Sequence, residues 1–328
     1  MTSLRARKPT ASELGLHRLF GLLLLLNAGV AALTVPFYGR FGLELDWATF
    51  LPSVAAVAFA AIGWLAHRST PGRPSEWPIA ESFAAFTLIA ISFSVVTPAQ
   101  YLAVALNRPL VDPWLARADA LMGISVPAAV EWTRTHPHVT SILQLSYYSL
   151  APQFVAPIVV LGLYYRERQA LWEYTFNFHV CLAITLGGLA LFPAACAFTY
   201  YGFDSLIDQS RFIQHFNAVR SGTFTTLQLR ELEGLITFPS FHVAGALMVT
   251  WAFRRHRVLF VGFAVLNSLL IASTVLLGPH YAIDILASLA VFLVSTFVYS
   301  RWAHLLTTSR KTGRRAEPHA DDELLRAG

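Results

Sequence analysis

Long apolar stretches recur along this chain, and most are about as long as a helix needs to be to cross a bilayer. A transmembrane helix takes about 20 mostly apolar residues, because a rise of about 1.5 Å per residue must span about 30 Å of hydrocarbon. Charged residues make up only 13% of the sequence, against roughly 25% in soluble domains. This composition excludes a soluble globular protein. The sequence therefore predicts an all-α integral membrane protein.

Eight stretches are candidates for membrane spans, and the sixth is the shortest. The predicted spans cover residues 19–37, 50–66, 82–105, 139–165, 174–198, 239–253, 258–277 and 281–302. The first is longer than the roughly 7–15 apolar residues of a signal peptide, and no Ala-x-Ala-like cleavage site follows it. We therefore expect it to be retained as a span.

Basic residues indicate how these spans are oriented, because lysine and arginine accumulate in the cytoplasmic loops of membrane proteins. With the N-terminus inside, the inside segments hold most of the 24 lysines and arginines, including the runs at 254–257 and 310–315. The formal net charge of +5 is then a topology signal and not evidence for nucleic-acid binding. We predict about eight transmembrane helices in an N-in, C-in chain.

Two long segments, 106–138 and 199–238, fall outside in this arrangement. Residues 111–122 of the first combine apolar and charged side chains at helical spacing, which predicts an interfacial helix. Its apolar residues are Trp114, Leu115, Ala118 and Leu121, and its charged residues are Asp112, Arg117 and Asp119.

Two histidines lie at the ends of predicted spans. His242 begins the sixth span, and His280 precedes Asp284 by four residues at the start of the eighth. Four residues on a helix bring an imidazole and a carboxylate to one face. Because the chain goes in through the sixth span and returns through the seventh, both histidines are predicted at the outer face. Polar groups in a membrane are costly and commonly functional.

Ser240, His242, His280 and Asp284 together suit phosphoryl transfer. One neutral imidazole can attack phosphorus while the carboxylate orients it, and a second, protonated imidazole can donate a proton to the leaving oxygen. If Pro239 takes the first position of a helix, Ser240 to His242 lie in its first turn, where free N–H groups favour an anion.

Arginines from the outside segments can stabilise the charge on the phosphate oxygens. Arg220 lies in the segment directly before Ser240, and Arg108 lies in the first long outside segment. On topology we expect Arg220 to bind the phosphate, with Arg108 as a second candidate. The remaining histidines show no metal-ligand spacing, so no metal or other cofactor is expected.

These residues resemble the type-2 phosphatidic acid phosphatase superfamily, in particular its branch similar to inositol phosphorylceramide synthases. Pro239-Ser240-Phe241-His242 looks like the superfamily's Pro-Ser-Gly-His motif, with Phe241 in place of the glycine of many members. Ser273-Thr274, followed after five residues by His280-x3-Asp284, looks like its Ser-Arg-x5-His-x3-Asp motif. Thr274 stands where many members have an arginine.

The first motif of the superfamily, Lys-x6-Arg-Pro, is matched only in part. Asn107-Arg108-Pro109 resembles its end, whereas Tyr101 stands in place of its lysine. The resemblance is close over about 191–292 and loose in the first half.

The resemblance implies a phosphatase-type helical core in the C-terminal half. It implies His280 as the nucleophile, Asp284 as its orienting carboxylate and His242 as the general acid. We expect Ser240 and Phe241 to bind the substrate or its phosphate. We predict an N-terminal cytoplasmic tail over 1–18, membrane helices and an outer loop over 19–138, the phosphatase- or phosphotransferase-like core over 139–306, and a disordered cytoplasmic tail over 307–328.

The predicted function is the transfer or hydrolysis of a phosphate-bearing group of a lipid at the outer membrane face, through a phosphohistidine. Phe241 and the long outside segments favour a lipid phosphotransferase similar to inositol phosphorylceramide synthases, and a lipid phosphate phosphatase is the alternative. The expected substrate is a phospholipid or an isoprenoid or sphingolipid phosphate. We expect the plasma (inner) membrane, with the active site facing the outside or periplasm.

The sequence also leaves open two functions other than a lipid phosphatase or phosphotransferase. A non-catalytic lipid transporter or flippase could bind an anionic headgroup with the same polar residues, although such folds often show paired broken helices that this sequence lacks. A haem-binding redox protein needs histidines paired at mid-membrane depth, whereas His242 and His280 lie at the ends of spans.

Overall fold

The computed structural model describes residues 11–55, 58, 62 and 77–314 of the chain. Almost all of the described secondary structure is helical, which confirms the all-α prediction. A single pair of two-residue parallel strands, Glu44–Leu45 and Thr226–Leu227, is the only sheet among the described residues.

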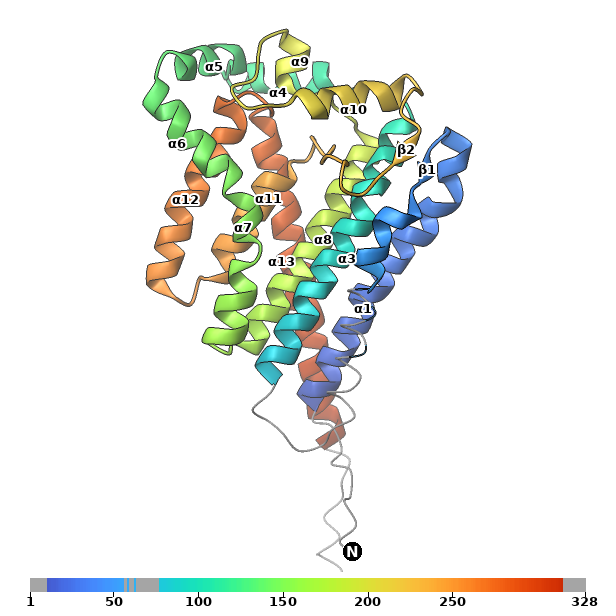
Figure 1. The fold of residues 1–328 in the computed structure, drawn as a ribbon. Helices are drawn as coiled ribbons and strands as arrows, with labels where there is room; N and C mark the ends of the chain where they lie inside the picture. The colour runs from blue at the N-terminus through green and yellow to red at the C-terminus, as the bar shows by residue number, and fades with distance from the viewer. Residues whose placement is uncertain (1–10, 56–57, 59–61, 63–76, 315–328) are drawn as a thin grey trace, which may run out of the picture.

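The structure has long helices and several short ones (Figure 1). In chain order the elements are α1 (Ala11–Thr34), the 3-10 helix η1 (Val35–Phe41), β1 (Glu44–Leu45), α3 (Trp77–Ala105), α4 (Asp112–Leu121), α5 (Val126–Arg134), α6 (Pro137–Tyr148), α7 (Leu150–Gln153), the π-helix η2 (Ile158–Tyr164), α8 (Arg168–Leu191), α9 (Ala197–Tyr201), α10 (Ser210–Arg220), β2 (Thr226–Leu227), α11 (Phe241–Ala252), α12 (Arg257–Leu276) and α13 (Ile283–Arg314).

Five described helices are long and apolar enough to cross a membrane, and a bent pair makes a sixth if α6 is joined to 150–164 across a 40° bend. The five are Arg18–Phe41, Pro78–Ala105, Arg168–Leu191, Arg257–Leu276 and Ile283–Trp302. The predicted span at 50–66 falls mostly outside the described residues. The predicted span at 239–253 is the 12-residue helix α11, which is shorter than a bilayer crossing needs. The total of eight spans stays a prediction.

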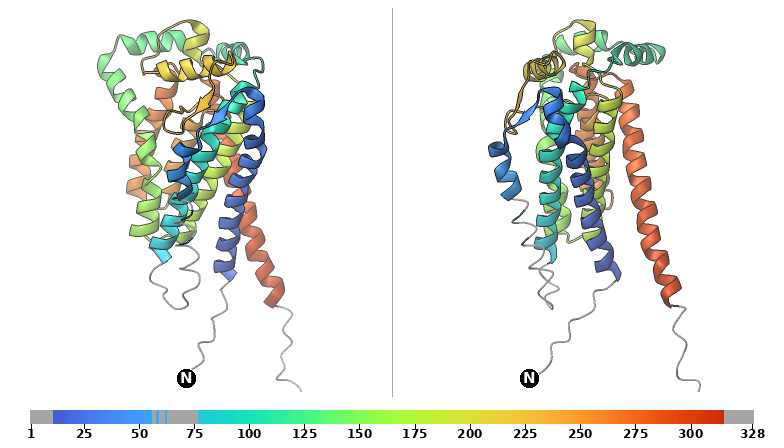
Figure 2. Two further views of the ribbon diagram at one scale, coloured as in Figure 1. Left: turned by 45° about the vertical axis from the view of Figure 1, so that its right-hand side comes forward. Right: turned by 90° about the vertical axis from the view of Figure 1, so that its right-hand side faces the viewer.

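The long helices run side by side, and α4, α5, α9 and α10 gather at one end of the bundle (Figures 1 and 2). The first residues of α1 and the last residues of α13 lie at the opposite end. Both described ends of the chain therefore lie on one side, and the N-in, C-in orientation stays a prediction. Helix α13 continues to Arg314, past residue 307 where the sequence predicted a disordered tail, and residues 315–328 lie outside the described part.

Buried polar pairs join the long helices to one another. The Ser92 hydroxyl donates to the Asn27 amide oxygen at 2.9 Å between α3 and α1. The Ser295 hydroxyl donates to the Asn177 oxygen at 2.8 Å between α13 and α8. Such bonds contribute on average about 0.6 kcal/mol each within a bilayer. They fix which faces of the helices meet, because apolar side chains alone can pack in several registers.

Candidate active site

The start of α11 carries Ser240 and His242. Ser240 is the N-cap residue, and its hydroxyl accepts a hydrogen bond from the Val243 N–H at 3.4 Å. The helix itself begins at Phe241, so Pro239 lies just before the cap and not at the first helical position that the sequence predicted. The local prediction was otherwise right, because His242 lies in the first turn of the helix.

His280 lies in the turn between α12 and α13, and Asp284 lies in the first turn of α13. The two side chains are buried, with exposed fractions of 4% and 1%, and His280 Nδ1 lies 2.9 Å from Asp284 Oδ2. His280 Nε2 lies 3.2 Å from the hydroxyl oxygen of Ser240. A carboxylate next to Nδ1 holds the proton on that nitrogen, which leaves Nε2 with the lone pair. A carboxylate, an imidazole and a hydroxyl are therefore connected across two helix starts.

His242 completes this group from the other side. Its ring centroid lies 6.3 Å from that of His280, with the ring planes inclined at 55°. Its outer face stacks on Tyr147 of α6, with centroids 4.6 Å apart and an interplanar angle of 17°. The structure thus brings together the two histidines and three partner side chains, Ser240, Asp284 and Tyr147, from three parts of the chain. The roles of these residues in a reaction stay predictions.

The two predicted arginines lie close to each other near the start of α4 and the end of α10. Arg220, at the end of α10, donates from Nη1 to the main-chain oxygen of Arg108 at 3.1 Å. Burial lowers the pKa of Arg220, and the nearby Asp112 carboxylate partly offsets this effect. The Arg108 side chain is exposed. Within the described part of the chain, neither guanidinium hydrogen-bonds to Ser240 or to either histidine.

Thr274 has a structural role at the position where the resemblance expects an arginine. It is fully buried, and its hydroxyl donates to the Ile271 carbonyl at 2.7 Å within the last turns of α12. Its own carbonyl accepts the His280 N–H at 2.9 Å. Thr274 therefore holds the main chain of the histidine and offers no charge to a phosphate.

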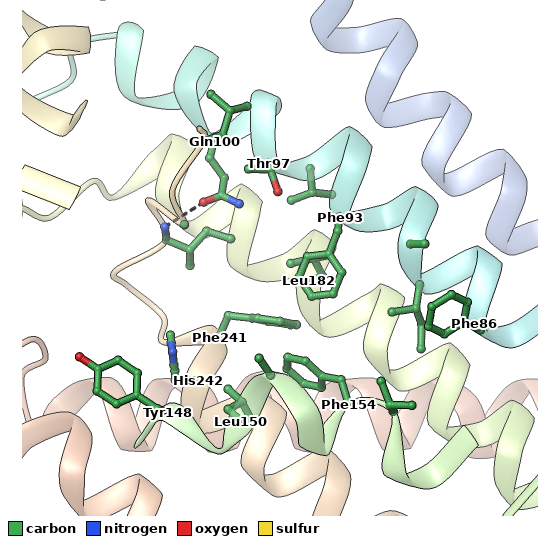
Figure 3. Close-up of a pocket in the computed structure, with 18 of the residues that line it drawn as sticks. Phe86, Phe93, Thr97, Gln100, Tyr148, Leu150, Phe154, Leu182, Phe241 and His242 are labelled. Carbon is green, nitrogen blue, oxygen red and sulfur yellow. Dashed lines mark hydrogen bonds between the residues drawn. The ribbon is translucent and has the colours of Figure 1, made fainter. Parts of the chain in front are cut away.

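An apolar cavity of about 500 Å³ opens next to His242 (Figure 3). Its walls come from α3, α6, α7, η2, α8, α11 and the segment that leads into α11. Its polar lining residues are Thr97, Gln100, Tyr147, Tyr148 and His242. Phe241 contributes its ring to the apolar wall, 5.8 Å from Phe154 and 5.5 Å from Phe178 between centroids. The side chain of Phe241 faces this cavity, and its predicted role in binding the substrate or its phosphate stays a prediction.

Gln100 fixes the segment that closes the upper part of the cavity (Figure 3). Its side-chain oxygen accepts the N–H groups of Leu235 and Ile236, the latter at 3.1 Å. Sequence reasoning missed Gln100, since a glutamine inside an apolar helix has no local signal that names its partner. The partner is more than a hundred residues away along the chain.

A family model described as the PAP2 superfamily matches residues 113–298. The chain belongs to the PAP2 superfamily. The matched region contains Ser240, both histidines, Asp284 and Arg220, whereas Arg108 lies before it. No curated protein and no solved structure matches the chain. PAP2 superfamily members are generally phosphatases or phosphotransferases that act on phosphoesters, and the apolar helices make this member an integral membrane protein.

Proposed function

We propose that this PAP2 superfamily member transfers or hydrolyses a phosphate-bearing group of a lipid through a phosphohistidine on His280. The observation that carries the proposal is the connected set Asp284, His280 and Ser240, with the His242 ring 6.3 Å from that of His280. This arrangement provides an oriented nucleophile and a second imidazole for proton transfer.

In the first half-reaction, the Nε2 lone pair of His280 attacks phosphorus. An N–P bond forms as the P–O bond to the leaving group breaks, and His242 in its protonated form donates a proton to the departing oxygen. Asp284 holds Nδ1–H and stabilises the positive charge that develops on the imidazole of His280. The Ser240 hydroxyl, which contacts Nε2 in the structure, releases it and donates to a phosphate oxygen.

In the second half-reaction, the acceptor is water or the hydroxyl of a lipid alcohol. His242, now neutral, takes the proton of the acceptor, whose oxygen attacks phosphorus as the N–P bond breaks. The phosphate is released or transferred, and His280 regains its lone pair. Arg220 is our candidate for neutralising phosphate charge, because it is a half-buried cation at this end of the molecule and precedes α11 in the chain.

A lipid substrate is supported by the apolar cavity beside His242. Ligand pockets are mostly apolar with a few polar groups that fix orientation, and this cavity has its imidazole and tyrosines on one part of the wall. A hydrocarbon chain in the cavity would bring its phosphate headgroup to the histidines. Phe241, which stands where many superfamily members have glycine, and the two long outside segments favour a lipid phosphotransferase of the inositol phosphorylceramide synthase-like branch over a plain phosphatase.

The charge pattern supports a location in the plasma (inner) membrane, with the site facing the outside or periplasm. The basic runs at 254–257 and 310–315 fall in predicted inside segments, and the histidines lie at the other end of their helices. Labelling of single engineered cysteines in intact cells by a membrane-impermeant reagent tests this orientation.

Turnover of labelled lipids by the purified protein tests the proposed reaction. Phospholipids, isoprenoid phosphates and sphingolipid phosphates are supplied with and without a lipid alcohol acceptor. Release of phosphate identifies a phosphatase, and a new lipid phosphoester that depends on the acceptor identifies a transferase. Absence of turnover with every donor contradicts the proposal.

His280→Ala separates the enzyme from a transporter. We expect it to remove turnover and the acid-labile, base-stable phosphoprotein that a phosphohistidine gives, because no other group replaces the nucleophile. A flippase that only binds a headgroup keeps measurable lipid movement in liposomes. His136→Gln is the matched control, since His136 is exposed on the linker between α5 and α6.

A further inference from the structure

Helix α4 buries two aspartates and exposes two large apolar side chains. The carboxylates of Asp112 and Asp119 are buried, with exposed fractions of 2% and 0%, whereas Trp114 and Leu121 are 72% and 82% exposed. The sequence grouped these aspartates with Arg117 on a polar face, and the structure corrects this interpretation. Burying a carboxylate costs free energy unless hydrogen bonds compensate it, so the partners of the two aspartates must be identified.

Asp119 binds the first residues of α13. Its two carboxylate oxygens accept the N–H groups of Ala282 at 2.9 Å and Ile283 at 2.8 Å. A helix start leaves N–H groups without partners inside the helix, and a nearby Ser, Thr, Asp or Asn usually accepts from them. The residues directly before Ile283 offer no such side chain. A carboxylate from a separate helix therefore caps α13.

Asp112 binds the same turn through a side chain. Its Oδ1 accepts the Tyr281 hydroxyl at 2.9 Å, and its two oxygens accept the Ala195 N–H at 3.1 and 2.9 Å. Tyr281 follows His280 directly and is only 1% exposed. Asp112 therefore links the histidine-bearing turn to the segment between α8 and α9.

Asp119 completes the main-chain hydrogen bonding of this turn. The His280 N–H donates to the Thr274 carbonyl at 2.9 Å, and the Tyr281 N–H donates to Asp284 at 3.2 Å. With Asp119 on the next two N–H groups, every main-chain donor from His280 to Ile283 has a partner. The backbone that carries the imidazole is thereby held at four consecutive residues.

We propose that Asp119 and Asp112 are positioning residues, which together make α4 a clamp that holds His280 in line with Ser240 and Asp284. The proposal rests on the proposed role of His280 as nucleophile. Neither aspartate touches the reacting atoms. Asp119 acts through the main chain after His280, and Asp112 acts through the side chain of Tyr281, the next residue. A displacement of about 1 Å at a nucleophile can reduce turnover about 100-fold, so loosening this clamp should be visible in kcat.

Asp119→Asn and Tyr281→Phe test the clamp by weakening it to different extents. Asp119→Asn removes the charge and one of two acceptors, and we expect kcat to fall about 10- to 100-fold with KM within about twofold. Tyr281→Phe removes only the hydroxyl that Asp112 binds, and we expect a fall of about 3- to 10-fold. Glu131→Gln on α5 is the control, since it removes an acidic charge from a side chain that is 70% exposed. Turnover is expressed per folded molecule, measured by size exclusion and thermal unfolding.

Acylation of imidazoles by diethyl pyrocarbonate, quantified by mass spectrometry, gives a readout that needs no turnover. We expect His280 to react several-fold faster in Asp119→Asn and less so in Tyr281→Phe, with no change in Glu131→Gln. If Asp119→Asn does not fold, Tyr281→Phe carries the test.

Unchanged kcat per folded molecule and unchanged labelling of His280 in the folded variants overturn the clamp. A wild type without turnover overturns the proposed function alone, and the labelling then decides whether α4 positions His280.

Discussion

The starts of α11 and α13 face each other and both carry a histidine, yet they are fixed in opposite ways. Ser240 caps α11 from within the same segment, with its hydroxyl on the Val243 N–H. The start of α13 is capped by Asp119, which is 163 positions away from Ala282 in the chain. The comparison shows that a local cap and a nonlocal cap can serve one site. Only the local cap leaves a signature in a short stretch of sequence.

The largest effect is expected from the carboxylate that contacts the His280 ring itself. Asp284→Asn replaces the carboxylate at 2.9 Å from Nδ1 by an amide, which weakens the charge that stabilises the imidazolium and can select the wrong tautomer. We expect kcat to fall about 100- to 10,000-fold. Steady-state turnover of the substrate found active measures it, with Asp208→Asn at an exposed position as control. A loss below about tenfold would show that the carboxylate does not orient His280.

Ser240→Ala measures how much the local cap matters to the reaction. It removes a cap worth about 1 kcal/mol and the hydroxyl next to Nε2, so we expect lower stability and a fall in kcat of about tenfold. Ser125→Ala is the matched variant, because Ser125 caps α5 with its hydroxyl 3.4 Å from the Ala128 N–H. It should lose similar stability and keep full turnover. Equal turnover in the two variants would assign Ser240 a capping role alone.

A double-mutant cycle connects the two helix starts. If the local and nonlocal caps act on the same imidazole, Ser240→Ala and Asp119→Asn should not be additive in their effects on kcat. We expect a coupling of at least about 0.5 kcal/mol in transition-state stabilisation. Turnover of the two single variants and the double variant gives the coupling directly. Additive effects would mean that the two caps support separate features of the site.

The smallest effect is expected at the apolar side of α11. Phe241→Leu keeps an apolar residue at the cavity wall but removes the ring that contacts Phe154 and Phe178. We expect KM for a lipid donor to rise about two- to fivefold with little change in kcat, because binding of the chain is weakened and the histidines are untouched. Donors of increasing chain length provide the comparison. A change in kcat without a change in KM would place Phe241 with the phosphate and not with the lipid chain.

Much of the site could be predicted from the sequence because its spacing is local. Ser240 and His242 lie at one helix start, and His280 and Asp284 are four residues apart, although His280 lies in the turn before α13, which begins at Ile283. The number of membrane spans was harder to predict. Apolar composition predicts that a segment is buried, but it does not tell a short helix packed among other helices from a helix that crosses the bilayer. The 12-residue helix α11 is an example.

The sequence by itself determined the helical class, the membrane setting and the two histidine-bearing motifs, since each depends on residues close together in the chain. Only the tertiary structure decided that Tyr147 stacks on His242, that the ring of Phe241 lines a cavity, and that α4 turns its aspartates inward. These contacts join residues separated by tens to hundreds of positions, and they depend on the path of the whole chain. A buried carboxylate binds the N–H groups that the fold leaves without a main-chain partner beside it. For Asp119 these N–H groups belong to the turn that follows His280.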